Sequence, residues 1–330
     1  MFIFLLWLFS ACFSQNLFSC DQQLSKDITQ MITQDYSYEK DIEVELISSG
    51  HDDFYLVMLD QKKHVLRVHQ SNKYWLSSIE NYLFELNWLL FLKDCNLAVA
   101  YPIVRKDGSL LGLIPTPEGN RYWALYSFSE GANSLTEEQA EIFGRSIAQI
   151  HLASNRFKTS YERHHTDIEF LLDDTMDRIE IFLNGTHQED LFFLQKLSAR
   201  LKQKIGLISF ENDEYGIIGG DFQGYNHHFN EKNAITHFDF ELVGYGWRAY
   251  DLAVFRWGRG CDDLLWEACL KGYNSIRPLS KREKDAIPIF VIIRKFWLVG
   301  SRITVPEGAA WVKDNWDDQI IELKIIFNNV

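Results

Sequence analysis

The chain has 330 residues, 46% hydrophobic and 15% aromatic, and carries a formal net charge of −13 at pH 7. This composition can bury a sizeable core and excludes an intrinsically disordered chain. The length exceeds the size at which one hydrophobic core usually stops growing, so we expect one large domain or two lobes. Because Lys and Arg are scattered through an acidic chain, no nucleic-acid or membrane partner is expected. The acidic balance favours a cationic ligand only slightly, since an acidic surface more often serves solubility alone.

The five cysteines are widely spaced and form no CxxC pair: Cys12, Cys20, Cys95, Cys261 and Cys269. This pattern predicts reduced thiols in a cytoplasmic protein. The apolar start "MFIFLLWLFSACFSQ" resembles a signal-peptide core, and "LFSAC" loosely resembles a lipoprotein cleavage box, but no Lys or Arg precedes the apolar run. We favour a packed or mis-assigned extension over residues 1–37, and a signal or anchor stays the alternative.

The sequence pattern of residues 38–130 predicts a lobe that consists mostly of β-sheet, with one helix. Residues 41–69 alternate like strands around the turns "GHDD" and "DQKK", which predicts an antiparallel meander. "SSIENYLFELNWLLFL" follows with apolar residues at helical spacing and Ser77 or Ser78 as its cap. "AVAYPIV" and "SLLGLIP" then bracket the turn "RKDG", and "RYWALYSFSEG" predicts a last strand ending at Gly131.

Residues 131–330 predict a mostly helical lobe. Thr136 and Gln139 form a capping box before "AEIFGRSIAQIHLAS", whose apolar residues repeat on one face. Further helices are expected over "DLFFLQKLSARLKQKI" and around residues 320–326. Ser280 and Glu283 form a second capping box, and Pro288 should kink or end the helix that follows it. Short strands "YGII" and "AITHF" flank a polar loop. The fold class is therefore α+β, with two lobes.

The polar loop carries oxygen donors at fixed spacing. Asp221 follows the first short strand, Asn226 lies five residues later, and Asp239 ends the second strand. Mg²⁺ prefers such oxygens and takes one or two carboxylates together with phosphate oxygens and water. Two of these residues can hold the metal while the third accepts a proton, which is the logic of phosphoryl transfer. A polar loop in which these residues only cap turns is the structural alternative.

The motif resembles that of a known family. "GGDFQGYN" followed by "FDFE" is similar to the "HGDxxxxN … DFD" pattern of the aminoglycoside phosphotransferase, choline kinase and homoserine kinase-like group, which has a protein-kinase-like fold. Other segments resemble further family features in the same order: "VLRVH", "FELNWL", "ALYSFSEG", "GRSIAQIH", "GYGWRAYDLAVFRW" and "GYNSIRPLS". The resemblance covers roughly residues 40–300.

This resemblance implies an ATP- and Mg²⁺-dependent phosphotransferase that acts on a hydroxyl of a small molecule. It implies Asp221 as catalytic base, Asn226 and Asp239 as metal ligands, and Asp251 as a buried brace of the loop. It also implies an ATP site in which Arg67 contacts phosphates and pairs with Glu85, Ser49 and Gly50 lie in a turn over the phosphates, and main-chain groups near Tyr126 and Phe128 hold adenine. A surface ion pair is the alternative for Arg67 and Glu85.

Three departures from the family pattern leave other functions open. Gly219 replaces a usual His, Gln223 replaces a frequent His, and Glu241 replaces the second Asp of "DFD". A catalytically degenerate pseudokinase that only holds nucleotide is therefore the main alternative. A kinase acting on protein side chains is a further one, although the chain lacks the DFG glycine and an APE-like segment. The identity of the acceptor and the oligomeric state stay open.

Two groups of side chains have both a functional and a structural interpretation. His227 and His228 suggest a metal site, but neighbouring residues of an extended segment point to opposite sides, so packing is favoured. Four aromatic residues could line an acceptor pocket or belong to the core: Tyr245, Trp247, Tyr250 and Trp257.

Overall fold

The structure is a computed structural model that describes residues 27–36, 42–50, 52–71, 73–116, 119–259 and 262–327. The chain forms two compact units by its contacts: Met1–Gln70 with Ile103–Phe128, and Ser71–Pro102 with Ser129–Val330. The apolar N-terminal segment, Cys12, Cys20 and Cys261 lie outside the described residues, as does His51 of the predicted phosphate turn. The predicted functional boundaries after residues 37 and 130 stay predictions.

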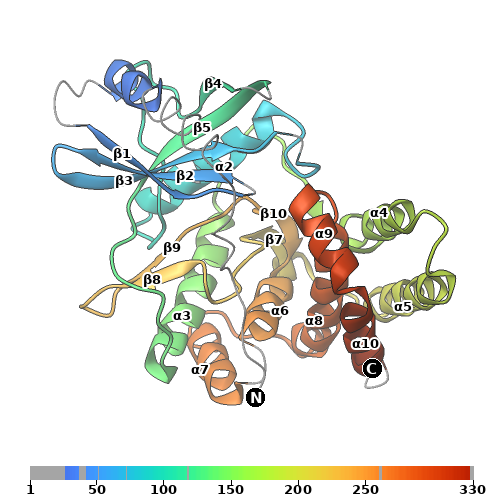
Figure 1. Ribbon diagram of the computed structural model, residues 1–330. Coiled ribbons are helices and arrows are strands. Elements are labelled where there is room, and N and C mark those ends of the chain that lie inside the picture. The colour runs from blue at the N-terminus through green and yellow to red at the C-terminus, as the bar shows by residue number, and fades with distance from the viewer. Residues whose placement is uncertain are drawn as a thin grey trace. The chain divides into compact units, whose positions relative to one another are not determined.

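The first unit contains a five-stranded antiparallel sheet, drawn with its strands side by side in Figure 1. Its spatial order is β1-β2-β3-β5-β4. The strands are β1 Glu43–Ser48, β2 Asp52–Leu59, β3 Lys62–His69, β4 Gly112–Thr116 and β5 Gly119–Ser127. The predicted meander of the first three strands is confirmed by the antiparallel ladders from β1 to β2 and from β2 to β3.

A helix over residues 27–36 completes the core of this unit. Ile28, Ile32 and Tyr36 recur every four residues and are buried in one cluster with sheet residues such as Val57 and Trp123. Spacing of four places side chains on one face of a helix, so this face covers apolar sheet residues. This helix lies within residues 1–37, for which the sequence predicted only an extension.

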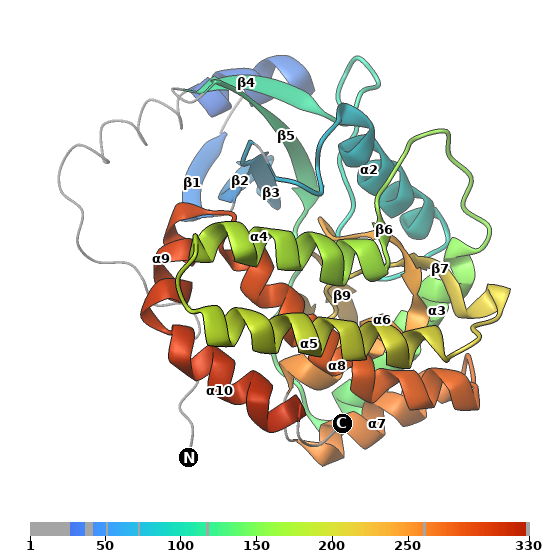
Figure 2. The ribbon, with the colours of Figure 1, turned by 90° about the vertical axis from the view of Figure 1, so that its right-hand side faces the viewer.

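The second unit is mostly helical. Its helices are α2 Ile79–Asp94, α3 Glu137–Ser154, α4 Asp174–Leu183, α5 Gln188–Gly206, α6 Arg248–Gly258, α7 Asp263–Asn274, α8 Lys281–Arg302, α9 Pro306–Asp314 and α10 Trp316–Phe327. Helices α4, α5 and α10 lie side by side in Figure 2, and Trp316 of α10 donates a hydrogen bond to Asp190 of α5. Four of these helices coincide with the helices predicted for residues 131–330, so that prediction is confirmed.

Short strands accompany these helices. β6 His165–Thr166, β10 Gly244–Trp247 and β7 Tyr215–Ile218 form one small sheet, and β8 His227–Phe229 pairs with β9 Ile235–His237 in another. The strands predicted from "YGII" and "AITHF" are therefore confirmed. The unit thus places the polar loop between two short ladders, β7 with β10 and β8 with β9.

Local signals in the sequence explain two of the helices. Thr136 accepts from the N–H of Gln139 and Ser280 accepts from the N–H of Glu283, so both predicted capping boxes are confirmed. Helix α8 continues through Pro288, so proline does not end the helix, while the kink that was the other predicted outcome stays a prediction. The following turns of α8 bury apolar residues, and this tertiary packing offsets the hydrogen bond that proline lacks.

The segment "AVAYPIV" differs from the prediction, because it forms only isolated bridges, including one from Val99 to His237. Pro102 has no N–H to donate to a ladder, which accounts for the missing strand. Strand β5 also ends at Ser127, earlier than the predicted Gly131.

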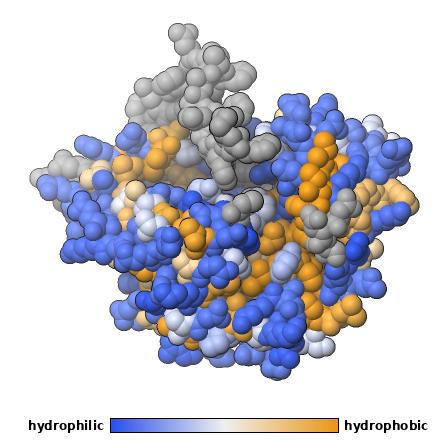
Figure 3. All heavy atoms as spheres, turned by 90° about the horizontal axis from the view of Figure 1, so that it is seen from below, coloured by the Kyte–Doolittle hydropathy of each residue, from blue (hydrophilic) through white to orange (hydrophobic). Residues whose placement is uncertain are grey.

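The face seen in Figure 3 is largely hydrophilic, and its apolar side chains gather mostly in the centre and on the right of the view. Within the residues that the structure describes, no helix has the length and apolar character needed to cross a bilayer.

Candidate active site

Asp251 of α6 holds the loop after β7 through hydrogen bonds to its backbone. Its two carboxylate oxygens accept hydrogen bonds from the N–H groups of Gly219 and Gly220, each at 2.8 Å. Asp251 has no exposed surface. A carboxylate that accepts two backbone N–H bonds in a dry environment holds a loop strongly. The expected brace of the loop by Asp251 is therefore confirmed.

His151 of α3 orients this carboxylate in turn. Its Nε2 lies 2.9 Å from Oδ2 of Asp251, and its Nδ1 lies 2.9 Å from the hydroxyl of Tyr273 in α7. Burial lowers the pKa of His151 to about 4, so the ring is neutral at pH 7 and donates one proton in this chain of contacts. Three helices thus converge on one brace.

The packing explains why Gly219 stands where the family uses His. A Cβ at residue 219 would lie 2.4 Å from the ring of Phe222, so the aromatic side chain fills the space that a side chain would need. Gly220 has φ +78°, and a Cβ there would lie 2.2 Å from the carbonyl oxygen of Leu242. The loop is therefore shaped by two glycines and one aromatic ring instead of a histidine.

Asp221 stands just after these glycines and receives donors from three side chains. The guanidinium of Arg294 in α8 forms an ion pair with Oδ1. The side-chain amides of Gln223 and Asn226 each donate to Oδ2 at 3.1 Å. Burial raises the pKa of Asp221 above its ordinary value, although Arg294 and Asn226 act in the opposite direction.

Asn226 and Asp239 meet at one end of the β8–β9 hairpin. His227 pairs with His237 in the ladder, and the N–H of Phe238 donates to the carbonyl of Asn226 at 3.1 Å. Asp239 follows directly, with φ +63°. Such left-handed backbone is uncommon for a residue other than glycine and is concentrated at functional sites. The structure therefore brings Asp221, Asn226 and Asp239 together.

The donor set fits a hard divalent cation. The amide nitrogen of Asn226 donates to Asp221, which leaves the amide oxygen as the atom that can ligate a metal. With a carboxylate of Asp239 on the adjacent strand end, this is an all-oxygen pair of the type Mg²⁺ uses. The side chains of the neighbouring histidines are engaged elsewhere, because His227 contacts the carbonyl of Ser134 and His228 that of Ser129.

Two basic residues that the sequence did not reveal hold the segment after Asp239. Lys73 forms an ion pair with Glu241, whose side chain is only 16% exposed. Arg163 donates to the carbonyls of Asn81, Glu241 and Val243. The carboxylate that replaces the second Asp of the motif is thus neutralised by a lysine, and its backbone is fixed by an arginine.

The predicted nucleotide residues of the first unit lie on or beside its sheet. Arg67 in β3 forms a buried ion pair with Asp52 of β2, at 2.5 Å. Ser49 donates to Asp53 at 2.6 Å in the turn that also contains Gly50. Tyr126 is buried in β5, and Lys63 lies over the ring of Phe128.

Glu85 is buried in α2 of the second unit. Its pairing with Arg67 and the nucleotide roles of these residues stay predictions.

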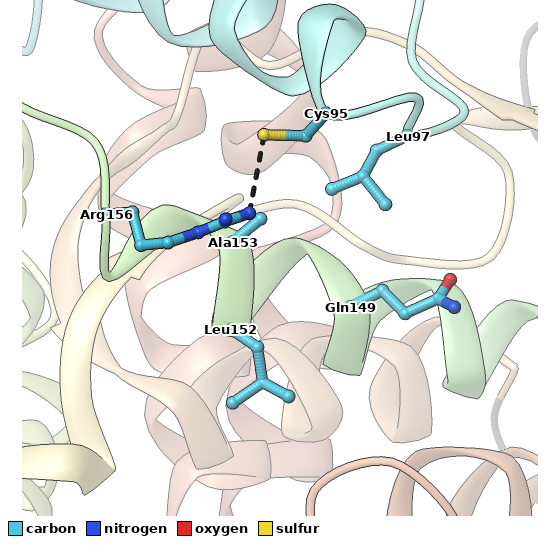
Figure 4. A pocket seen from close by; sticks show the side chains of 6 residues that line it. All are labelled: Cys95, Leu97, Gln149, Leu152, Ala153 and Arg156. Carbon is cyan, nitrogen blue, oxygen red and sulfur yellow. Dashed lines mark hydrogen bonds between the residues drawn. The ribbon is translucent and has the colours of Figure 1, made fainter.

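The hollow in Figure 4 is separate from this chemistry. It measures about 320 Å³ and is lined by residues from the end of α2 and the last turns of α3, among them Cys95 and Arg156. The Arg156 guanidinium donates to the Cys95 thiol at 3.6 Å. None of Asp221, Asn226 and Asp239 lines this hollow, so we do not assign it to the active site.

Comparison with known proteins identifies the class of the chain. Residues 43–279 match the model of the phosphotransferase enzyme family, whose short name is APH. An uncharacterized protein of Synechocystis is 31% identical over 82% of this chain and 75% of its own length. The homoserine kinase of Brucella anthropi is 29% identical over 71% of this chain and 72% of its own length.

Solved structures show the same fold. A microcompartment-associated aminopropanol kinase has a TM-score of 0.74 at 23% identity, covering 92% of this chain and 95% of that one. Amicoumacin kinase, solved in complex with AMP-PNP, Ca²⁺ and Ami, has a TM-score of 0.73 at 15% identity, covering 93% of this chain and 96% of that one.

The chain is an α+β protein with a protein-kinase-like fold, as predicted. It belongs to the phosphotransferase enzyme family, which confirms the resemblance read from its motifs.

Proposed function

We propose that the protein transfers the γ-phosphate of ATP to a hydroxyl of a small molecule. The observation that carries the proposal is the placement of Asp221, Asn226 and Asp239 at one site, on a loop fixed by Asp251. Membership in the phosphotransferase family supports the reaction class. The nucleotide analogue in amicoumacin kinase supports ATP as the donor.

In this proposal Asp221 orients the acceptor hydroxyl and takes its proton. The hydroxyl oxygen forms the new bond to the γ-phosphorus, the bond to the β–γ bridging oxygen breaks, and ADP leaves with that oxygen. The proton moves to a carboxylate oxygen of Asp221, whose raised pKa makes it a better proton acceptor than an exposed aspartate.

Asn226 and Asp239 would hold Mg²⁺, which neutralises charge on the phosphates when bound. Arg67 would contact phosphates, with Ser49 and Gly50 over them and Tyr126 and Phe128 at the adenine. Glu85 would pair with Arg67. Asp52 already neutralises Arg67 in the structure, so a phosphate would compete with that carboxylate for the guanidinium.

A nucleotide-binding pseudokinase is the second candidate, because two acidic groups of the motif are already paired. Arg294 pairs with Asp221 and Lys73 pairs with Glu241. In a pseudokinase these ion pairs would persist with nucleotide bound.

The deciding experiment measures ATP consumption and phosphorylated product with Mg²⁺ and a panel of amino alcohols, hydroxy acids, aminoglycosides and sugars. Thermal stabilisation by Mg·ATP is recorded in parallel. Acceptor-dependent product supports the phosphotransferase. Stabilisation by Mg·ATP without product from any acceptor favours the pseudokinase. If neither product nor stabilisation is observed, both candidate functions are contradicted.

A further inference from the structure

Arg294 offers more hydrogen-bond donors beside Asp221 than the described residues accept. Its side chain is 3% exposed, and one amino group pairs with Asp221 while the other lies 3.5 Å from the carbonyl of Gly220. Its Nε–H has no partner in the described part of the chain. Buried donors are rarely left unsatisfied, so this edge of Arg294 is suited to a further acceptor.

The groups around Arg294 are mainly aromatic faces. The guanidinium lies 4.7 Å from the ring centre of Trp297 and 5.6 Å from that of Trp257. Such faces stabilise a cation but accept no strong hydrogen bond in its plane. The neighbouring Tyr250 makes a side-chain hydrogen bond with Arg294 and is neutral, since burial raises its pKa to about 12. Apart from Asp221, these neighbours supply no negative charge.

A second arginine on the adjacent helix repeats this pattern. Arg178 of α4 lies 3.9 Å above the ring centre of Tyr74, and its Nε–H also lacks a partner among the residues described. Tyr74 packs on Phe170, and Phe170 packs on Trp297, so one aromatic cluster separates the two guanidinium groups. Asp174, one turn before Arg178, offsets part of its charge.

Further positive charge follows on α8. Arg302 is two turns beyond Arg294, and the pKa of Arg302 is lowered by burial and by the charge of Arg294. Two positive charges that are close together and partly buried repel each other, and a bound anion would lower this electrostatic repulsion. The surroundings of Asp221 thus hold the positive charge of Arg294 as well as the negative charges of Glu241 and Asp251.

We propose that the acceptor carries an anionic group, a carboxylate or a phosphate, and that Arg294 binds this group beside the hydroxyl served by Asp221. This inference rests on the proposed phosphotransferase function. The planar guanidinium can keep one amino group on Asp221 and present its Nε edge to an oxyanion. A cationic acceptor would have to approach a buried guanidinium of like charge, which reverses the slight preference suggested by the net charge.

The first test compares acceptors that differ only by the anionic group. Suitable pairs are serine with ethanolamine, homoserine with 3-aminopropanol, and glycerol 3-phosphate with glycerol. We expect kcat/KM to be at least about tenfold higher for the charged member of the preferred pair, since a site that hydrogen-bonds a charged group rejects an analogue lacking it. The first two pairs report on a carboxylate, and the third reports on a phosphate.

The second test uses Arg294→Lys, which keeps the charge near Asp221 but removes the planar donor edge. We expect KM for the charged acceptor to rise at least about tenfold, with a much smaller change in kcat and in KM for ATP. The matched control is Arg256→Lys on α6, whose partner Asp263 is 78% exposed, and its kinetic constants should be unchanged.

The outcomes separate the inference from the function it rests on. Turnover without preference for the charged member, or with preference for the uncharged one, overturns the inference and leaves the phosphotransferase in place. If Arg294→Lys lowers kcat equally for both members of a pair, Arg294 is only the counterion of Asp221 and the inference also fails. No product with any acceptor contradicts the proposed function and the inference together.

Discussion

Arg294 and Asp221 form a buried ion pair that joins helix α8 to the loop after β7. The two side chains are 3% and 15% exposed, and they lie 73 residues apart in the chain. The pair gives the loop a fixed position and gives the carboxylate a cationic neighbour. Its energetic role can be measured separately from its role in binding.

We predict strong coupling between these two residues in a double-mutant cycle. Asp221→Asn and Arg294→Met should each lower the free energy of unfolding by about 2–4 kcal/mol, because each leaves a buried charge without its partner. The double variant should lose less than the sum, with a coupling of about 1–3 kcal/mol. Urea unfolding of the four proteins gives these values, and additive losses would show that the pair does not interact energetically.

Asp251→Asn should weaken both the fold and the reaction. The amide group would direct an N–H toward a glycine N–H or toward His151, so one buried donor would lose its acceptor. We expect a loss of about 2–4 kcal/mol in the free energy of unfolding and a lower kcat with little change in KM for ATP.

The control for this brace is Asp263→Asn, which removes one partner of an exposed ion pair with Arg256. Its effect on stability should stay within about 0.5 kcal/mol. Equal stability of the Asp251 and Asp263 variants would rule out the proposed role of the brace.

In the first unit, Arg67→Met should leave the buried carboxylate of Asp52 without its guanidinium. The expected loss is about 3–5 kcal/mol, since uncompensated charges in a dry interior are costly. If Arg67 also contacts phosphates, KM for ATP rises in any variant that stays folded, while KM for the acceptor is unchanged. Arg67→Lys keeps the charge and should raise KM for ATP less than Arg67→Met, and an unaltered KM for ATP in a folded Arg67→Met protein would exclude the phosphate contact.

Stability should fall as the solution is acidified below neutrality. Burial lowers the pKa of His151 to about 4 and the pKa of His164 well below 6.5. The unfolded chain therefore binds protons at these histidines near pH 6.5, whereas the folded chain keeps them neutral. As a result, the free energy of unfolding decreases from about pH 6.5 downward. Each histidine contributes up to about 1.4 kcal/mol per pH unit within this window.

Urea unfolding at several pH values between 7 and 5 measures this slope before most carboxylates titrate. His151→Gln should reduce the slope by the share of one histidine, while His187→Gln, at a half-exposed side chain, should leave it unchanged. A slope that is the same in all three proteins would mean that His151 is not buried as a neutral ring.

Local patterns in the sequence predicted the elements that depend on neighbouring residues. The capping boxes at Thr136 and Ser280 and the meander of β1 to β3 involve contacts a few residues apart or across short turns. The spacing of Asp221, Asn226 and Asp239 likewise predicted a shared site, because five residues separate Asp221 from Asn226 and one hairpin connects Asn226 to Asp239.

The sequence could not reveal contacts made by distant residues. Lys73 is 168 residues from Glu241, and Arg163 is about 80 residues from the carbonyls that it binds. No local periodicity marks such basic residues as buried, since Lys and Arg are mostly exposed. The structural basis for Gly219 was hidden for a different reason. Phe222 is only three residues away, but the sequence does not show that its ring folds back into the space beside Gly219.

The central claim is that Asp221 serves as the base of a phosphoryl transfer. The most direct measurement is the rate of phosphorylated product formation at saturating Mg·ATP and acceptor, for the parent protein and Asp221→Asn, at a temperature where both are folded. We predict a rate lower by about 10²–10⁴-fold in the variant, with nucleotide-dependent thermal stabilisation retained. Equal rates in the two proteins would contradict the account.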